Sequence, residues 1–175
     1  YLLTFTYRRD GTSRFSKDNQ WGNFPAAALA WNISDEDFLK NSNLISSLKL
    51  RASYGITGQQ ELQEKDIFLN RYRSGDNNSQ YQFGNTVIRS LIPSEINPDI
   101  KWEETATFEF GIDYGLFDES LSGSLNFFQK NSTDLLFQAS VADGTNFSNS
   151  IIQNIGELQI QGLEFSINAD VIKKD

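Results

Sequence analysis

The sequence contains no cysteine, no histidine and no methionine. Without cysteine and histidine there is no Cys or His nucleophile, no Ser-His-Asp triad and no Cys/His zinc site. The absence of cysteine also removes any disulfide framework, so disulfides say nothing about the compartment. The adjacent carboxylates Glu103 and Glu104 cannot share a site, because neighbouring strand residues point to opposite faces. We therefore expect no enzyme activity, no cofactor and no metal.

Long hydrophobic runs are also missing. No segment approaches the roughly 18 consecutive apolar residues of a transmembrane helix, and the mean hydropathy is -0.45. Transmembrane helices are thus excluded. Membrane-barrel strands are not excluded, because every second residue of such a strand faces a wet lumen. The 15 basic and 23 acidic residues give a net charge of -8, which argues against nucleic-acid binding.

The most regular pattern lies between Trp102 and Lys130. In the run 102–116 the large apolar side chains occupy even positions, and a second alternating run, 121–130, follows the short turn 117–120. Period two over this length predicts strands with one apolar and one polar face. Such strands reach the roughly 9–11 residues that a tilted strand needs to cross a bilayer. The pattern therefore predicts a transmembrane β-hairpin.

Four further segments show the same alternation and complete a set of six expected strands. They cover residues 1–8, 24–33, 48–57 and 163–171. Long polar loops are expected at 10–23, 58–101 and 131–155, and shorter connections at 34–47 and 117–120. Ser34 followed by the acidic Asp37 predicts that a short helix opens the connection 34–47. Because every second connection is long, the long loops emerge on one side, as in outer-membrane barrels.

These features predict an all-β fold, a segment of an antiparallel transmembrane β-barrel. Six strands cannot close a barrel, since about eight is the smallest single-chain bacterial case. An open sheet edge in lipid leaves N–H and C=O groups unsatisfied, so the first and last strands need partners elsewhere. The strand pattern already begins at Tyr1. We therefore expect an internal piece of a longer polypeptide.

Two groups of residues are candidates for function. Charged residues on the polar faces of the strands are expected to face a hydrated lumen: Arg8, Lys49, Arg51, Glu109 and Asp113. Four aromatic residues of the long loops are candidates for stacking on a sugar or docking a partner protein: Trp21, Tyr72, Tyr81 and Phe83. The competing explanations are simple solvation of the wall and self-packing of the loops. The stretch 76–78 lacks the glycine and distant glutamate of a calcium loop and is interpreted as a polar loop tip.

Two other interpretations of the alternation remain open. In a soluble or surface-exposed β-sandwich that binds carbohydrate or protein, the apolar faces would pack on each other. In a passive porin or an adhesin-displaying barrel, the apolar faces would meet lipid, as in a transporter. A transporter differs from a porin in having a plug, which the upstream sequence would reveal.

Short motifs follow one another in order along nearly the whole chain. They occupy residues 8–15 (RRDGTSRF), 21–25 (WGNFP), 29–34 (LAWNIS), 48–55 (LKLRASYG), 57–59, 97–103 (NPDIKWE), 133–136, 154–157 and 162–164. Together they resemble the SusC/RagA-type TonB-linked outer-membrane transporters of Bacteroidetes. Phe128 and Ser132 depart from the Tyr and basic residues that this family usually shows there.

The resemblance implies a multi-pass protein of the outer membrane with extracellular long loops. Residues 1–175 would form about six strands of one 22-stranded barrel domain. The plug domain and TonB box that the family carries are not in this sequence. The resemblance also implies active uptake of a bulky nutrient, an oligosaccharide or a peptide, driven by TonB-ExbB-ExbD through the plug. A SusD-like surface lipoprotein is the implied partner.

Overall fold

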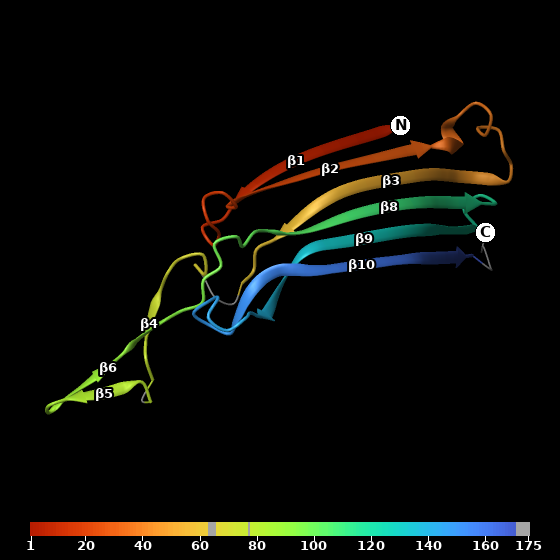
Figure 1. The fold of residues 1–175 in the computed structure, drawn as a ribbon. Helices are drawn as coiled ribbons and strands as arrows, with labels where there is room; N and C mark the ends of the chain where they lie inside the picture. Colours follow the sequence, from red (N-terminus) through yellow and green to blue (C-terminus); the bar gives the residue numbers. More distant parts are fainter. Residues whose placement is uncertain (63–65, 77, 171–175) are drawn as a thin grey trace.

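In the computed structural model, which describes residues 1–62, 66–76 and 78–170, six long strands form one antiparallel sheet (Figure 1). Their bounds are β1 Leu2–Gly11, β2 Trp21–Asn32, β3 Ile45–Gln59, β8 Glu103–Leu116, β9 Leu121–Ser140 and β10 Ser150–Ala169. Each strand pairs with the next long strand of the chain, so that β1 and β10 form the two edges. The predicted antiparallel sheet of six strands is confirmed.

Four short strands lie outside this sheet, in the connection between β3 and β8. Of these, β4 (Tyr72–Ser74) pairs with β7 (Leu91–Pro93), and β5 (Gln80–Phe83) pairs with β6 (Thr86–Arg89). They project past one end of the long sheet, called here the loop end (Figure 1). At the other end, the turn end, a short 3₁₀ helix, η1 (Ile33–Asp35), follows β2. No helix within the described residues is long and apolar enough to cross a membrane.

The long sheet is a single layer. Within the described part of the chain its strands pack beside their sheet neighbours, and no second sheet lies against either face. A β-sandwich needs such a second sheet to bury its apolar side chains. Here those side chains are uncovered, with Leu163 and Phe165 73% and 65% exposed. The sandwich alternative therefore does not fit the structure.

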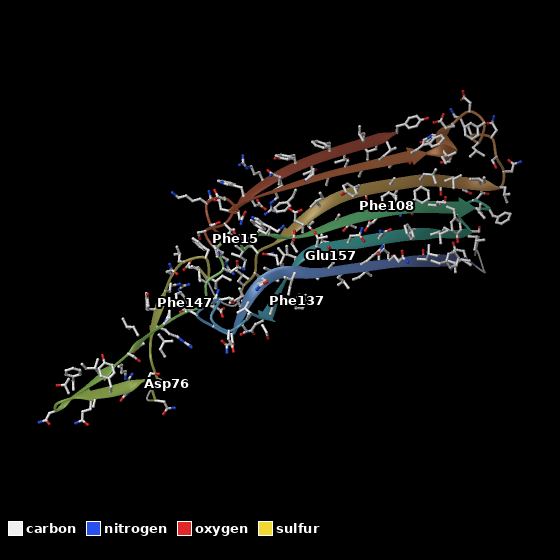
Figure 2. All side chains as sticks on the ribbon, in the orientation of Figure 1. Phe15, Asp76, Phe108, Phe137, Phe147 and Glu157 are labelled. Carbon is white, nitrogen blue, oxygen red and sulfur yellow. The ribbon has the colours of Figure 1, made fainter. Side chains whose placement is uncertain are left out.

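The strand register gathers the apolar side chains on one face of the sheet, the face that carries Phe108 of β8 (labelled in Figure 2). One row across all six strands consists of Leu3, Leu29, Ala52, Phe110, Phe127 and Leu163. The adjacent row, on the opposite face, consists of Leu2, Ala30, Arg51, Gly111, Asn126 and Glu164. Burying one large apolar side chain contributes roughly 1.5–3 kcal/mol to stability. A face exposed to water does not gain this contribution. Such a face is suited to hydrocarbon.

The apolar face is slanted relative to the rows of paired residues. In the row of Tyr54 and Phe108, the positions on β9 and β10 are Gln129 and Gln161. The apolar band thus ends earlier on these strands and lies nearer the turn end. Barrel strands tilt by about 35–45°, so each step of about 4.8 Å to a neighbouring strand shifts a row by roughly 3 Å along the membrane normal. A slant of the apolar band across the rows is what tilted strands would produce.

The expected loop at 131–155 is wrong over most of its length. β9 continues to Ser140 and β10 begins at Ser150, leaving residues 141–149 as the connection. The added part of the ladder is polar because both faces of a strand can be wet beyond the hydrocarbon. Register shifts between Asn154 and Leu158 accompany this stretch, as expected for bulges near a barrel rim. The loop expected at 10–23 likewise shortens to 12–20.

The turn end also differs in part from expectation. The tight turn at 117–120 is present. The helix expected to begin at Ser34 is only the three-residue η1, preceded by Asn32, and Asn32 makes no capping hydrogen bond with its side chain. A helix this short gains one or two backbone bonds against the cost of nucleation, so the local geometry follows the connection to β3.

The apolar face can be tested by introducing arginine at Phe110, in the middle of the band. If Phe110 meets hydrocarbon, Phe110→Arg should destabilise the barrel by about 2–4 kcal/mol. Urea unfolding of the full-length protein in lipid vesicles measures this. Ser53→Arg is the matched control, because Ser53 lies opposite Glu109 on the polar face, and its effect should be small. Equal sensitivity at both positions would contradict the assignment of the faces.

Candidate functional site: the polar wall and the loop-end rim

The centre of the polar face is a hydrogen-bonded group contributed by three adjacent strands. The Arg51 guanidinium on β3 donates from Nε to Oδ2 of Asp113 on β8 (2.7 Å) and from Nη2 to Oδ1 (2.8 Å). Nη2 also donates to Oδ1 of Asn126 on β9 (2.9 Å). Gly111 leaves room for this group, since a Cβ there would lie 2.5 Å from Asn126 Oδ1. The absence of a side chain at 111 is thus explained by the approach of the guanidinium.

The residues expected to face the lumen do share one face. Lys49 is opposite Asp113, and Glu109 is opposite Ser53, beside the Arg51 group. Arg8 lies apart from them at the loop end of β1, where it forms an ion pair with Asp10 (2.7 Å). The structure therefore brings four of the five residues together.

The polar face carries a concavity of about 440 Å³, lined mainly by residues of that face. Its charged lining includes Arg51, Glu109, Lys130 and Glu164. Because both signs are present, the concavity is suited to polar, largely uncharged surfaces, such as a hydrated lumen offers.

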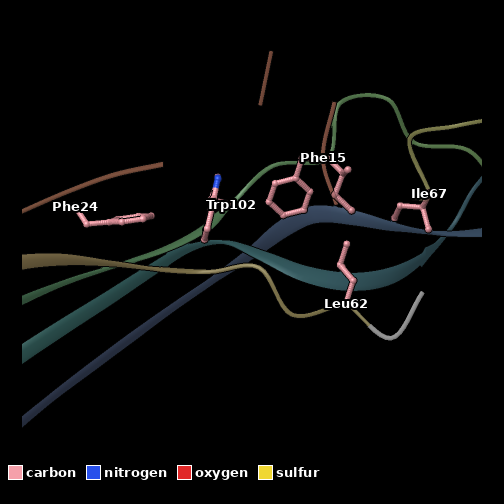
Figure 3. Close-up of a cluster of buried hydrophobic side chains, with 6 residues drawn as sticks. Phe15, Phe24, Leu62, Ile67 and Trp102 are labelled. Carbon is pink, nitrogen blue, oxygen red and sulfur yellow. The ribbon is translucent and has the colours of Figure 1, made fainter. Parts of the chain in front are cut away.

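A cluster of buried apolar side chains closes the loop end, and we call it the rim cluster (Figure 3). It consists of Phe15, Phe24, Leu62, Ile67, Ile100 and Trp102. The Trp102 ring meets the rings of Phe15 and Phe24 edge to face, at centroid distances of 5.8 and 5.3 Å. Such pairs contribute about 0.5–1.5 kcal/mol beyond the area that they bury. The cluster fixes three loop segments to one another and to β2.

The alternation of the sequence does not reveal this cluster. It predicts Trp102 on the apolar face of the strand, whereas Trp102 is buried just before β8 begins. A period-two pattern cannot show where a strand leaves the bilayer, because odd and even positions continue to alternate beyond that point. The available signal was the presence of Phe15, Leu62 and Ile67 within segments otherwise rich in polar residues.

Asparagine side chains add polar connections between the loop segments. Asn97 Nδ2 donates to Ile152 O (2.7 Å), and Asn154 Nδ2 donates to Lys101 O (2.9 Å). Asn19 and Asn146 bind the backbone of residues 99–100 and 96 in the same manner. An asparagine can satisfy both an N–H and a C=O of a loop backbone that has no strand partner. These contacts hold the base of the connection between β3 and β8.

A polar cleft of about 490 Å³ opens beside the rim cluster. Its lining includes Arg8, Arg14, Gln60, Glu61 and Trp102. The Gln60 side-chain oxygen is buried there and has no hydrogen-bond partner among the described residues. The cleft places mixed donors and acceptors at the mouth of the polar face.

The four loop aromatics lie in different places. Trp21 starts β2 and lies under the Arg9 guanidinium, which is 4.8 Å from the ring centroid. Tyr72 is on β4. Only Tyr81 and Phe83, both on β5, come together, with their centroids 6.2 Å apart.

The Asp76 carboxylate accepts from Asn78 N (2.9 Å) and Ser79 Oγ (3.1 Å), which is the role of a polar turn residue.

An aromatic group marks the opposite, turn end. Tyr1 stacks on Trp31, with ring centroids 5.6 Å apart. The Trp31 indole donates to Glu36 Oε1 (2.9 Å), and this bond, followed by one from Tyr1, lowers the pKa of Glu36. Aromatic rings with one polar contact suit a membrane–water interface.

These features define a class of protein. An antiparallel single-layer sheet, with one slanted apolar face and one concave polar face, is the wall of a transmembrane β-barrel. The family model "TonB dependent receptor-like, beta-barrel" matches residues 1–171, and the chain belongs to this family.

Proteins of similar sequence and solved structures of similar fold support this family membership. The chain is 44% identical to the TonB-dependent receptor SusC of Bacteroides thetaiotaomicron and 41% identical to the TonB-dependent receptor P39 of Formosa agariphila, each over its whole length. It covers 18% and 16% of those proteins, so it spans less than a fifth of their length. Structures of RagAB match 98% of the chain, and the match covers 18% of theirs at 25–26% identity. The TM-scores are 0.81 for the closed-closed and 0.79 for the open-open state of that peptide importer.

The rim cluster can be tested by truncating Trp102. Replacing a buried tryptophan by alanine in a packed cluster costs about 3–5 kcal/mol. Here the loss should fall on the loop end, so Trp102→Ala should accelerate protease cleavage in the connections 12–20 and 60–102 while the six long strands stay folded. Limited proteolysis followed by mass spectrometry locates the cuts. Phe147→Ala, at an exposed loop aromatic, should leave the cleavage pattern unchanged. Equal loss of protease resistance in all parts of the barrel would show that the cluster does not stabilise the loop end alone.

Proposed function

We propose that residues 1–175 form part of the barrel wall of a transporter that takes up a bulky nutrient, an oligosaccharide or a peptide, across the outer membrane. The observation that carries the proposal is the division of one sheet into an apolar face and a concave polar face. The family membership supports it. In this assignment Arg8, Lys49, Arg51, Glu109 and Asp113 face the lumen.

The proposed role of the polar wall is to hold a hydrated interior in a fixed shape. The bonds from Arg51 to Asp113 and Asn126 join β3, β8 and β9 without using their backbone groups. An ion pair that is half exposed contributes at most about 1 kcal/mol to stability. Its main effect is therefore to orient the side chains that line the passage. The wall catalyses no reaction, and the transported solute passes it without chemical change.

The partners follow from the family resemblance. A SusD-like surface lipoprotein would bind at the loop end, where cargo enters. TonB-ExbB-ExbD would drive uptake through the plug domain that the family resemblance implies. The loop aromatics Trp21, Tyr72, Tyr81 and Phe83 would contact cargo or partner at the mouth.

The energy requirement separates this function from that of a passive porin. Cells that carry the full-length protein should lose uptake of its cargo when TonB is deleted, because the closed passage opens only under work done by TonB. Uptake of labelled oligosaccharide and peptide mixtures by isogenic strains measures this. The control is a small solute that enters through general porins, whose uptake should not change. Cargo uptake that persists without TonB would support a passive pore and overturn the proposal.

Sidedness gives a second test, because the chain has no native cysteine. Cysteine placed at Ser13 or Asn78, at the loop end, should react with a membrane-impermeant maleimide on intact cells. Cysteine at Asp118, in the turn between β8 and β9, should react only after the outer membrane is opened. The full-length protein without these substitutions gives the background. Labelling of Asp118 with protection of Asn78 would invert the proposed orientation.

A further inference from the structure

The apolar face of β2 carries one tryptophan near each end. Trp21 and Trp31 lie ten positions apart and share the face of Leu29, because side chains alternate along a strand. Ten residues at about 3.4 Å each, tilted by about 35–45°, span roughly 24–28 Å along the membrane normal. The apolar band of an outer-membrane barrel is about 25 Å tall and has an aromatic girdle at each edge. Trp21 therefore marks the loop-end edge of the hydrocarbon, and Trp31 marks the turn-end edge.

A cation lies on this face at the loop-end girdle. Among the odd positions of residues 1–11 and 21–31, which share the face of Leu3 and Leu29, Arg9 is the only charged residue. The Trp21 ring lies across β1 at Gly11, where a Cβ would be 2.8 Å from the ring. The Arg9 guanidinium lies over that ring, 4.8 Å from its centroid. The ring thus holds the guanidinium at the level of the girdle.

The charge of Arg9 is not neutralised within the described part of the chain. No carboxylate there forms an ion pair with it, whereas its neighbour Arg8, on the opposite face, is paired with Asp10. The acid on the apolar face of β8 is Glu104, three strand spacings from β1. At about 4.8 Å per spacing this separation is roughly 14 Å, which exceeds the Debye length of about 8 Å in physiological salt. Arg9 therefore presents a positive charge to the lipid headgroups.

The turn-end girdle has the opposite charge. The Trp31 indole donates to Glu36 Oε1 (2.9 Å). The same connection contains Asp35 and Asp37 and one nearby cation, Lys40. An anionic headgroup would be attracted to Arg9 and repelled beside Glu36. The charges of β1, β2 and the connection after β2 therefore favour anionic lipid in the leaflet at the loop end.

We propose that Arg9 and Trp21 bind the phosphate group of an anionic lipid in the leaflet at the loop end. A guanidinium offers several N–H donors to phosphate oxygens, and the apolar face below it receives the acyl chains. The site lies on the outer surface of the barrel, so it goes beyond the proposed transport function and does not depend on the cargo. For Trp21 this lipid contact replaces contact with cargo or partner, because its ring faces away from the polar wall.

The experiment measures which lipids gather beside this site in the full-length barrel, reconstituted in phosphatidylcholine vesicles. A bimane fluorophore is attached to Pro25→Cys, and any cysteine outside residues 1–175 is replaced by serine. Pro25 shares the face of Trp21 four positions further along β2, roughly 10 Å deeper in the membrane. The vesicles contain a minor fraction of either phosphatidic acid or phosphatidylcholine that is brominated in the upper acyl chain, because bromine quenches the fluorophore.

Quenching should show about fivefold local enrichment of phosphatidic acid over phosphatidylcholine, the ratio that corresponds to about 1 kcal/mol for one basic residue near anionic lipid. Arg9→Gln should abolish this enrichment. Arg9→Lys keeps the charge and should retain most of it. Arg8→Gln is the matched control, since Arg8 lies on the opposite face, and it should leave the enrichment unchanged. Added salt should reduce the enrichment, because salt screens exposed charges.

Equal quenching by the two lipids in the labelled barrel would overturn the inference, and so would enrichment that survives Arg9→Gln. An equal decrease in Arg8→Gln and Arg9→Gln would show an effect of net charge instead of a site. Weak quenching by both lipids would show that Pro25 does not face lipid, and the inference would fail with that assignment. If enrichment is found but cargo uptake persists without TonB, the proposed function fails and the lipid site stands.

Discussion

The structure depends on one constraint, the pairing of backbone groups that lie in hydrocarbon. An unpaired N–H or C=O there costs several kcal/mol, because no water is available to replace the missing partner. The ladders from β1 to β10 satisfy these groups within a single layer. With the backbone satisfied, the side chains alone decide which surroundings each face can meet. The two faces of β8, with Phe108 and Phe110 on one and Glu109 and Asp113 on the other, therefore suit lipid and water respectively.

The two ends of the sheet are held by different interactions. At the turn end, the chain returns through residues 33–44 and the tight turn 117–120, and the Tyr1–Trp31 stack lies near the boundary of the apolar band. At the loop end, the backbone is irregular and needs other partners. The rim cluster supplies apolar packing there, and the side chains of Asn97 and Asn154 donate hydrogen bonds to the carbonyls of Ile152 in β10 and of Lys101. A firm rim lets a long connection extend outward without loosening the strands beneath it.

The part of the fold that obeys period two could be predicted from the sequence. Six strands, their antiparallel order and the composition of both faces follow from alternation, because burial in lipid imposes it residue by residue. Beyond the hydrocarbon this requirement ends. The polar half of β9 and β10 therefore could not be distinguished from a loop, although its backbone ladder continues to Ser140 and Ser150.

The candidate site was predictable in its charges but not in its contacts. Lys49, Arg51, Glu109 and Asp113 were identified by parity, whereas the bond from Arg51 to Asn126 depends on strand register, which parity does not give. The rim cluster joins residues up to 87 positions apart in the chain, Phe15 and Trp102 among them at 5.8 Å between ring centroids. Such long-range contacts leave no periodic signal.

The central claim is that consecutive residues of β8 meet lipid and water alternately. Spin labels placed singly from Ala106 to Tyr114 in the full-length protein, reconstituted in lipid vesicles, test this directly. The collision rate with oxygen, which concentrates in hydrocarbon, should peak at even positions, including 108, 110 and 112. The collision rate with a water-soluble nickel complex should peak at odd positions, including 109 and 113. Two profiles that rise and fall together, or oxygen maxima at the odd positions, would contradict the assignment of the two faces.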